Sequence, residues 1–156
     1  MRLVVVSDSH GNKWNLFDAI EKESSADVVY FLGDGFRDFQ AATEIYGDKK
    51  IFIGVQGNCD SCSNLPTTDI RTLENAKIYA THGFLEKVKF TYYGLEEAAS
   101  ANGCNLVLFG HTHQPTDFYD NGVYYFNPGS VREGFYGVVD ITENGIMCIR
   151  KVLRSY

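Results

Sequence analysis

Three short runs of consecutive apolar residues stand in the first third of the sequence, at Leu3–Val6, Val28–Leu32 and Ile51–Val55. Runs without alternating polar residues are typical of strands that are buried on both faces of a sheet. Apolar residues at helical spacing separate these runs, over residues 14–20 and 36–45. The order β-α-β-α-β predicts neighbouring parallel strands joined by right-handed crossovers, with helices that cover the sheet.

The remaining part of the sequence predicts more strands than helices. One helix is expected at about Tyr93–Ala101, and further strands are expected at Asp69–Leu73, Lys77–Thr81, Leu106–Phe109, Val123–Phe126, Tyr136–Ile141 and Ile146–Val152. Eight or nine strands in one sheet would be wide for 156 residues. We therefore predict an α/β fold of four layers, in which two packed mixed β-sheets are flanked by helices, and a single domain over residues 1–156.

The composition is that of an ordinary globular protein, with 44% hydrophobic and 22% charged residues. The formal net charge is −6 and no run of Lys or Arg exceeds the pair Lys49–Lys50, which argues against stable nucleic-acid binding. The first apolar run is too short for a signal peptide or a membrane span, and four scattered cysteines do not form a disulfide framework. We therefore expect a cytoplasmic protein that does not bind membranes.

Side chains that can bind metal ions follow the apolar runs. They come from five separate segments of the chain: Asp8, His10, Asp34, Asn58, His82, His111 and His113. Each has a structural explanation when taken alone, because an Asp or Asn after a strand usually forms a turn. In α/β sheets, however, ligands bind beyond the carboxyl ends of the strands, where these segments are expected to converge. All four histidines of the chain occupy such positions, which favours a metal site.

Imidazole, carboxylate and amide ligands without thiolates suit Mn, Fe, Ni or Zn. Seven ligands are too many for one ion that keeps a position open for water, but they suffice for two ions that share a carboxylate. Two ions about 3.5–4 Å apart can clamp a phosphoryl group and generate hydroxide at neutral pH. Asp34, which lies between the early and the late segments, is the natural shared ligand. The pattern predicts hydrolysis of phosphate esters.

Five motifs contain these residues: Asp8-Ser9-His10, Gly33-Asp34, Gly57-Asn58-Cys59-Asp60, His82-Gly83 and Gly110-His111-Thr112-His113. In order and spacing they resemble the calcineurin-like metallophosphoesterases, and in particular the small single-domain YfcE-type phosphodiesterase branch. The segment Asn127-Pro128-Gly129-Ser130 also resembles that branch. The resemblance, which runs from Asp8 to about Arg132, implies the metallophosphoesterase double β-sandwich.

The resemblance also implies a role for each ligand. It divides them between two ions: Asp8, His10 and His113 for the first, Asn58, His82 and His111 for the second, and Asp34 for both. A hydroxide that bridges the ions would attack phosphorus, while the ions and Asn58 stabilise the phosphate oxygens. Mn is the expected metal, with Ni, Fe and Zn as alternatives, and a small phosphodiester is the expected substrate.

Cys59 departs from the broader superfamily, where a histidine commonly follows the Asn and is thought to protonate the leaving oxygen. It matches the small phosphodiesterase branch and leaves the general acid open. A thiol with an unperturbed pKa of about 8.5 can donate a proton at neutral pH, but Cys59 can equally be a small side chain that fills a gap. Cys59 and Cys62 also form a C-x-x-C pair, whose place in a polar stretch does not favour a redox or zinc site.

The main alternative is a protein-binding scaffold, because the smallest subunit of the retromer coat resembles this branch but has a degraded metal site. The complete ligand set favours an enzyme. A phosphomonoesterase would usually need further cationic groups, and Arg37 and Arg132, which could approach the site, are more typical of solvated surface charges. Tyr92-Tyr93 and Phe118-Tyr119 are expected in loops or at element ends, where they could form a contact between copies of the chain.

Overall fold

The computed structural model describes residues 1–153, which form two five-stranded sheets. The strand order of the first sheet is β10 (Gly145–Val152), β9 (Phe135–Thr142), β1 (Arg2–Val6), β2 (Val28–Phe31) and β3 (Ile51–Gly54). The order of the second is β4 (Thr68–Leu73), β5 (Ala76–Thr81), β6 (Leu106–Leu108), β8 (Val123–Asn127) and β7 (Thr116–Asp120). Each sheet has three parallel strands at its centre or edge and antiparallel strands beside them, so both are mixed.

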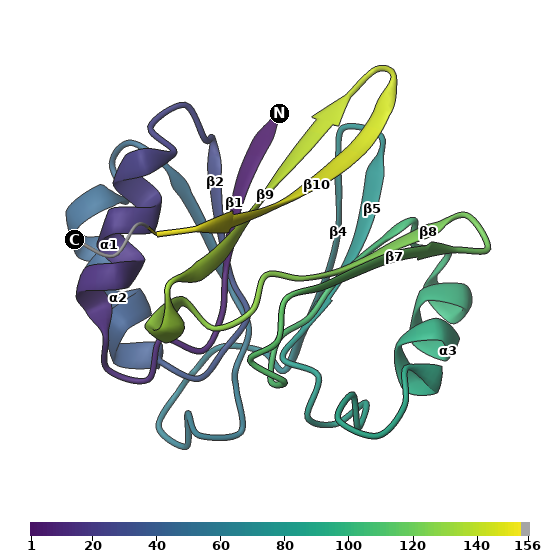
Figure 1. Cartoon of the computed structure of the whole chain (residues 1–156), viewed down its shortest axis with the longest axis horizontal. Coiled ribbons are helices and arrows are strands. Elements are labelled where there is room, and N and C mark those ends of the chain that lie inside the picture. Colours follow the sequence, from purple (N-terminus) through teal and green to yellow (C-terminus); the bar gives the residue numbers. More distant parts are fainter. Residues whose placement is uncertain (154–156) are drawn as a thin grey trace.

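The two sheets pack face to face, and helices cover their outer faces (Figure 1). Helices α1 (Lys13–Lys22) and α2 (Phe36–Tyr46) pack on the first sheet, and α3 (Tyr93–Asn102) packs on the second. A short 3-10 helix, η1 (Val131–Glu133), follows β8. The predicted fold of two packed mixed sheets flanked by helices is confirmed.

The apolar run of β1 is continuous because both faces of the strand are covered. Leu3 and Val5 point into the core between the sheets, whereas Val4 and Val6 belong to the core under α1 and α2. All four side chains are fully buried. Burial of each such side chain stabilises the fold by about 1.5–3 kcal/mol, so the central strand is firmly held and its carboxyl end is a fixed point.

Local residues mark the ends of the first two helices. The side chain of Asn12 accepts a hydrogen bond from the amide of Asn15 at 3.2 Å and thereby caps α1, and Gly47 follows the last residue of α2. Trp14, which the spacing placed on the apolar face of α1, is instead 69% exposed. It lies in the first turn of α1, before the buried positions, and its ring meets the ring of Phe17 edge-on.

The structure contains one strand that the sequence did not predict. Phe118 and Tyr119, expected in a loop or at an element end, lie inside the edge strand β7, where Phe118 pairs with Tyr125 of β8. Only Phe118 of this segment packs against a core, so the apolar pattern of the strand is weak. Tyr92 and Tyr93 do lie at an element end, the start of α3.

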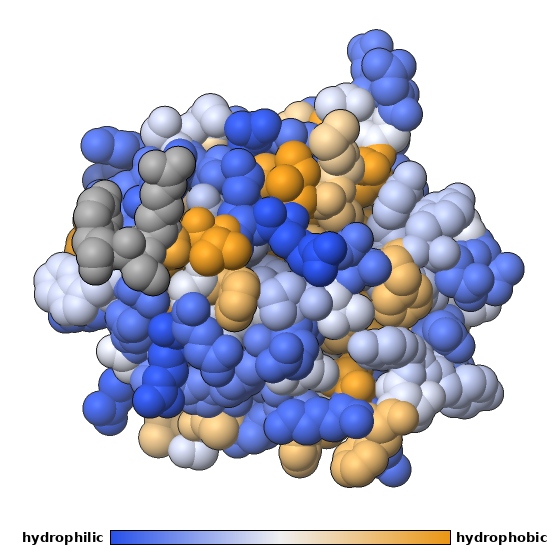
Figure 2. All heavy atoms as spheres, in the orientation of Figure 1, coloured by the Kyte–Doolittle hydropathy of each residue, from blue (hydrophilic) through white to orange (hydrophobic). Residues whose placement is uncertain are grey.

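The surface is mostly hydrophilic, with apolar side chains scattered over the face shown in Figure 2. Exposed apolar residues include Met147 and Val152 on β10 and Tyr119 on β7. Within residues 1–153, no helix has the length and apolar character needed to cross a membrane.

Candidate metal centre

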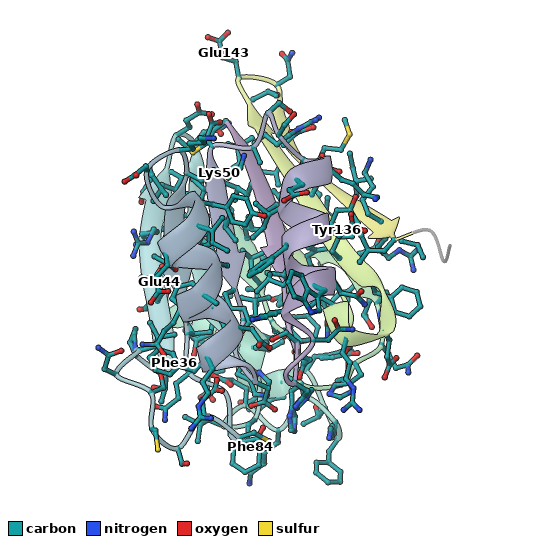
Figure 3. All side chains as sticks on the ribbon, turned by 90° about the vertical axis from the view of Figure 1, so that its left-hand side faces the viewer. Phe36, Glu44, Lys50, Phe84, Tyr136 and Glu143 are labelled. Carbon is teal, nitrogen blue, oxygen red and sulfur yellow. The ribbon has the colours of Figure 1, made fainter. Side chains whose placement is uncertain are left out.

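All seven predicted ligands lie at one end of the sandwich, where the parallel strands finish. They follow five strands: Asp8 and His10 after β1, Asp34 after β2, Asn58 after β3, His82 after β5, and His111 and His113 after β6. Phe36 and Phe84 mark this end of the molecule, which is opposite the β9–β10 turn at Glu143 (Figure 3). Because the first strands are parallel and deeply buried, segments far apart in the sequence end at the same place.

One group of side chains consists of Asp8, His10 and His113, whose possible ligand atoms all lie within 4.8 Å of one another. The Nε2 atoms of His10 and His113 are 3.2 Å apart. Asp8 Oδ1 lies 3.2 Å from His113 Nε2 and 3.6 Å from His10 Nε2. Two imidazoles and a carboxylate thus converge on one point, as a divalent transition metal requires.

A second group contains Asp34, His82 and His111, again with ligand atoms within 4.8 Å of one another. His82 Nε2 lies 3.3 Å from Asp34 Oδ2 and 3.2 Å from His111 Nδ1. The amide oxygen of Asn58 lies 3.0 Å from the same His82 nitrogen. The structure therefore brings Asn58 into the second group, where the resemblance placed it.

Asp34 lies between the two groups. Its Oδ2 atom is 3.3 Å from His82 Nε2 in the second group and 3.8 Å from His10 Nε2 in the first. Its Oδ1 atom accepts a hydrogen bond from the amide of Cys59 at 2.8 Å, which fixes the carboxylate plane. This is the placement that a carboxylate shared by two ions needs.

The donor set fits metal ions, as the carboxylate of Asp8 indicates. Its side chain is fully buried, and Oδ2 accepts hydrogen bonds from Ser7 Oγ at 2.5 Å and from the His111 amide at 3.1 Å. Oδ1 is the one buried side-chain oxygen or nitrogen of residues 1–153 that has no hydrogen-bond partner. Because an unpaired buried polar atom costs free energy and calls for an explanation, Oδ1 is best understood as a ligand atom that faces a cation.

The two histidines of the second group differ in electrostatics. Burial opposes protonation of His82, but Asp34 and Asp8 outweigh burial and raise its pKa, whereas the pKa of His111 is lowered. His82 Nδ1 lies 2.7 Å from the carbonyl oxygen of Leu32, to which it donates, so Nε2 faces the site. Burial and the nearby His82 lower the pKa of His111 to about 4, which keeps its imidazole neutral at pH 7. Burial opposes ionisation of Asp34, but its contacts with His82 and the Cys59 amide outweigh burial and hold its pKa below the ordinary value. Asp34 is therefore an anion at neutral pH.

The backbone at these positions is unusual. Five of the seven predicted ligands have positive φ angles of 42–68°: Asp8, His10, Asp34, His111 and His113. Non-glycine residues rarely adopt this conformation, and where they do the strain is commonly associated with function. Gly57 permits the close approach of two ligand loops, because a Cβ atom there would collide with the carboxylate and the amide of Asp34.

Buried polar side chains hold the ligand loops in place. Asp60 accepts hydrogen bonds from four amides, those of Asp34, Gly35 and Phe36 in one loop and of Gly57 in another. One carboxylate thereby joins the Asp34 loop to the Asn58 loop. Supporting contacts of this kind orient metal ligands and tune their affinity.

Three further residues support the remaining ligand loops. Asp38 Oδ2 accepts from Ser9 Oγ at 2.6 Å and from the Gly11 amide at 2.9 Å, on either side of His10. The amide of Asn127 donates to the carbonyl of Gly110 at 3.0 Å, and Ser130 Oγ donates to the carbonyl of Asp8 at 2.8 Å.

Sequence reasoning named Asp60, Asn127 and Ser130 within motifs but gave them no role, and it missed Asp38. For Asp60 the sequence did contain a signal. An Asp three residues from a glycine in a turn typically accepts a hydrogen bond from the backbone of that turn.

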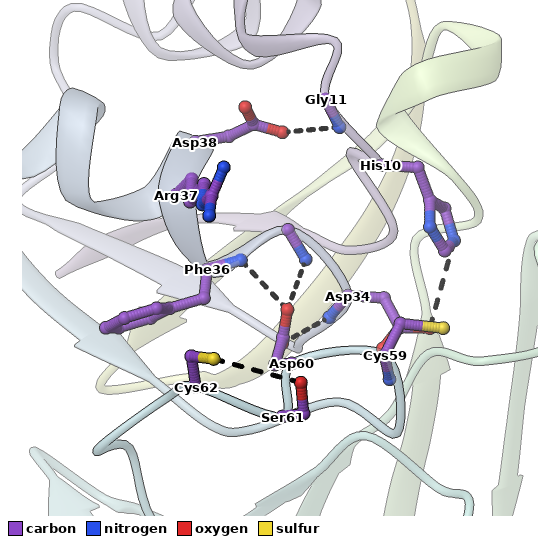
Figure 4. Close-up of a pocket in the computed structure, with 11 residues that line it drawn as sticks. His10, Gly11, Asp34, Phe36, Arg37, Asp38, Cys59, Asp60, Ser61 and Cys62 are labelled. Carbon is purple, nitrogen blue, oxygen red and sulfur yellow. Dashed lines mark hydrogen bonds and ion pairs between the residues drawn. The ribbon is translucent and has the colours of Figure 1, made fainter.

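Cys59 borders the centre from the solvent side. Its Sγ atom lies within 4.8 Å of ligand atoms of His10 and Asp34, and its side chain is exposed (Figure 4). Partial burial, together with the negative charge of Asp34, raises the pKa of the thiol, so Cys59 carries its proton at neutral pH. Cys59 and Cys62, a second exposed free thiol, line one hollow beside the centre.

The geometry can be compared with known proteins. A family model described as the calcineurin-like phosphoesterase superfamily domain matches residues 1–144, nearly the whole chain. The chain belongs to the calcineurin-like phosphoesterase superfamily. This confirms the family that the five motifs indicated, and it agrees with two His/Asp groups able to hold metal ions.

Two relatives with similar sequences are named as phosphoesterases. The chain is 30% identical over 134 positions to the probable metallophosphoesterase YsnB of Bacillus subtilis, with 85% of this chain and 76% of YsnB covered. It is 27% identical over 168 positions to phosphodiesterase YfcE of Escherichia coli, with 90% and 88% covered. A solved archaeal phosphodiesterase shares the fold, with a TM-score of 0.79, 21% identity and coverage of 98% and 100%.

Proposed function

We propose that this protein is a phosphodiesterase that uses two divalent metal ions. The observation that carries the proposal is the position of Asp34, whose Oδ2 atom faces His10 in one ligand group and His82 in the other. Two separate sites would not need a shared carboxylate, whereas a dinuclear centre does. The names of YsnB and YfcE support the same reaction class.

The proposed assignment of residues follows the two groups. Asp8, His10 and His113 hold one ion, Asn58, His82 and His111 hold the second, and Asp34 contacts both. When bound, two such ions supply a hydroxide nucleophile at neutral pH and positive charge for the phosphate oxygens. Imidazole and carboxylate ligands suit Mn, which we propose as the metal, ahead of Ni, Fe and Zn.

The chain's own residues have separate tasks in this reaction. The amide oxygen of Asn58 is directed at His82, and its NH2 group donates one hydrogen to Cys59 Sγ at 3.5 Å, which leaves a second hydrogen for a phosphate oxygen. The Cys59 thiol lies beside Asp34, where it can protonate a leaving oxygen. The buried wall around Asp8 and His82 limits water on the protein side of the centre.

The scaffold alternative receives less support from the geometry. A protein that only binds partners has no need for a buried carboxylate oxygen without a hydrogen-bond partner, and such an atom destabilises the fold. Five left-handed ligand residues add to that cost. Retention of both features supports selection for metal binding.

The test is hydrolysis of bis-p-nitrophenyl phosphate by metal-stripped protein to which Mn²⁺ is restored, with the bound metal counted by elemental analysis. We expect two ions per chain and turnover that depends on them. Asp34→Asn should lower turnover by about a thousandfold, because loss of several kcal/mol of transition-state stabilisation has that effect. Asp48→Asn, at an exposed position away from the centre, is the matched control.

Two results would overturn the proposal. Folded protein that binds two ions but turns over no diester with Mn²⁺, Ni²⁺, Fe²⁺ or Zn²⁺ would favour the scaffold. Turnover that survives Asp34→Asn would refute the shared carboxylate.

A further inference from the structure

Two hollows of similar size lie on either side of the metal centre. One, of about 390 Å³, borders His10 of the first ligand group together with Asp34 and Cys59. The other, of about 360 Å³, borders Asn58 and His82 of the second group. Both volumes are in the range of small-molecule sites. A phosphodiester has two organic substituents, and a phosphate held between the groups has a hollow available for each.

Figure 4 draws the side chains that line the first hollow, with Arg37 among them. Arg37, near the start of α2, lines it and forms no ion pair or side-chain hydrogen bond with any residue in 1–153. Asp38 and Asp60 also line it, but backbone amides already donate to both carboxylates. Asp34, Asp38 and Asp60 are more than nine-tenths buried, whereas Arg37 is exposed, so the guanidinium is the charged group that a substituent in this hollow would contact. A guanidinium suits a carboxylate or a phosphate.

The second hollow is neutral and partly aromatic. Apart from His82, the described side chains that line it carry no ionisable group; Gln56, Thr67 and Thr81 are polar, and Phe84 and Leu85 are apolar. Phe84 is 52% exposed, and its ring meets the ring of His111 edge-on at a centroid distance of 5.5 Å. The exposed ring of Phe84 therefore offers a face on which an aromatic group of a ligand can pack.

We propose that the two hollows are substrate subsites of opposite character, and that the protein selects unsymmetrical phosphodiesters. The Phe84 hollow takes a neutral aromatic substituent, whose ring packs on Phe84. The Arg37 hollow takes a substituent that carries negative charge. Arg37 and Phe84 are specificity residues, and neither belongs to the ligand set. The inference rests on the proposed phosphodiesterase function, because it assumes a diester phosphate between the two groups.

The test measures binding, so that it does not depend on turnover. Phosphinates contain two P–C bonds and cannot be hydrolysed at phosphorus. Two of them share a p-nitrobenzyl group and differ in the second arm, which is 2-carboxyethyl in one and the isosteric, uncharged 3-methylbutyl in the other. Calorimetry with Mn²⁺-loaded protein gives their Kd values. We expect the carboxylate to bind about fivefold more tightly, the most that an exposed ion pair contributes.

Variants identify the residues responsible. Arg37→Gln should make the two Kd values equal, whereas Arg132→Gln, which removes a charge that lines neither hollow, should leave the fivefold ratio intact. Phe84→Leu should weaken both ligands by about threefold to tenfold, the range for an aromatic pair. Phe90→Leu, in the same loop but 88% exposed and outside the hollow, should not.

The proposal is overturned if Arg37→Gln keeps the preference for the carboxylate, if Arg132→Gln removes it to the same extent, or if Phe84→Leu behaves like Phe90→Leu. Bis-p-nitrophenyl phosphate turnover by the same preparations reports separately on the proposed function. Charge-selective binding without turnover would refute the proposed phosphodiesterase activity but support the two subsites. Turnover without charge-selective binding would support the activity but refute the subsites.

Discussion

The two ends of the sandwich use the same rare backbone conformation in different ways. At the metal centre, left-handed residues such as Asp34 and His111 are buried or half-buried and form hydrogen bonds with other loops: Asp34 accepts from the Cys59 amide, and the His111 amide donates to Asp8. At the opposite end, Glu74 has a φ of 51° in the exposed β4–β5 turn, where solvent surrounds it. Strain at a turn can be relieved by substitution, whereas strain at the centre comes with the positions of ligand atoms.

The same contrast holds for charge. Asp8 is fully buried and has an oxygen without a hydrogen-bond partner, and a buried unsatisfied polar atom costs about 1–3 kcal/mol. The Glu74 side chain is 46% exposed and lies 3.2 Å from the amino terminus, an arrangement worth at most about 1 kcal/mol. Asp8 therefore lowers the stability of the fold at the metal-centre end, whereas Glu74 hardly changes it at the opposite end. Three substitutions test this difference, from the largest expected effect to the smallest.

Asp60→Asn should have the largest effect, because the supporting carboxylate has no spare acceptor. Each of its oxygens accepts two amide hydrogens, so the NH2 group of an Asn would face two N–H donors. We expect a loss of about 3 kcal/mol in the free energy of unfolding, measured with urea in the presence of a chelator. The metal content should fall too, because the Asp34 and Asn58 loops separate.

The matched control for Asp60→Asn is Asp117→Asn. Asp117 is an exposed Asp whose carboxylate lies 2.8 Å from the Nε atom of Arg150. Its loss should change stability by less than about 1 kcal/mol. Equal effects of the two substitutions would show that Asp60 does not hold the loops together.

Much of this end of the molecule could be predicted from the sequence, because strand order alone brings the ligands together. Buried runs such as β1 predicted a parallel sheet, and residues that follow such strands meet at its carboxyl edge. The contacts of Asp38, and those of Asp60 with the Asp34 loop, could not be predicted, because they depend on which loops touch in three dimensions. Strand β7 was missed for another reason: an edge strand with one inward apolar side chain has little apolar pattern, although Asn121-Gly122 after it is a hairpin signal.

Asp8→Asn should raise the stability of the metal-free protein. An Asn can accept the Ser7 and His111 hydrogen bonds with its oxygen and present NH2 to His113 Nε2, which lies 3.2 Å from the present Oδ1. It removes a buried unpaired oxygen, and Asn tolerates the left-handed conformation better than most residues. We expect a gain of about 1–2 kcal/mol in urea unfolding with chelator present.

The opposite sign is expected when metal is present. Wild-type protein should gain stability on addition of Mn²⁺, since a ligand that binds only the folded state stabilises it, and Asp8→Asn should gain much less. The free energies of unfolding of wild type and Asp8→Asn, plotted against Mn²⁺ concentration, should therefore cross. A variant that is less stable than wild type in chelator would refute the cost that we assign to Asp8.

Glu74→Asn should have the smallest effect, because two small contributions oppose each other. Asn fits the left-handed turn position more readily than Glu, a gain of about 0.5–1 kcal/mol, while loss of the pair with the amino terminus removes up to about 1 kcal/mol. The net change should be within about 0.5 kcal/mol at low salt. In 1 M NaCl, where an exposed pair is largely screened, only the backbone gain remains and the variant should become the more stable protein. Diester turnover should be unchanged, since the turn lies at the end opposite the metal centre.

A comparison variant is His111→Asn, which places the same residue type at a left-handed position in the metal centre. It should abolish metal-dependent turnover. If Glu74→Asn instead costs well over 1 kcal/mol at both salt concentrations, the turn is not the tolerant region that its exposure indicates, and the difference between the two ends is smaller than their geometry implies.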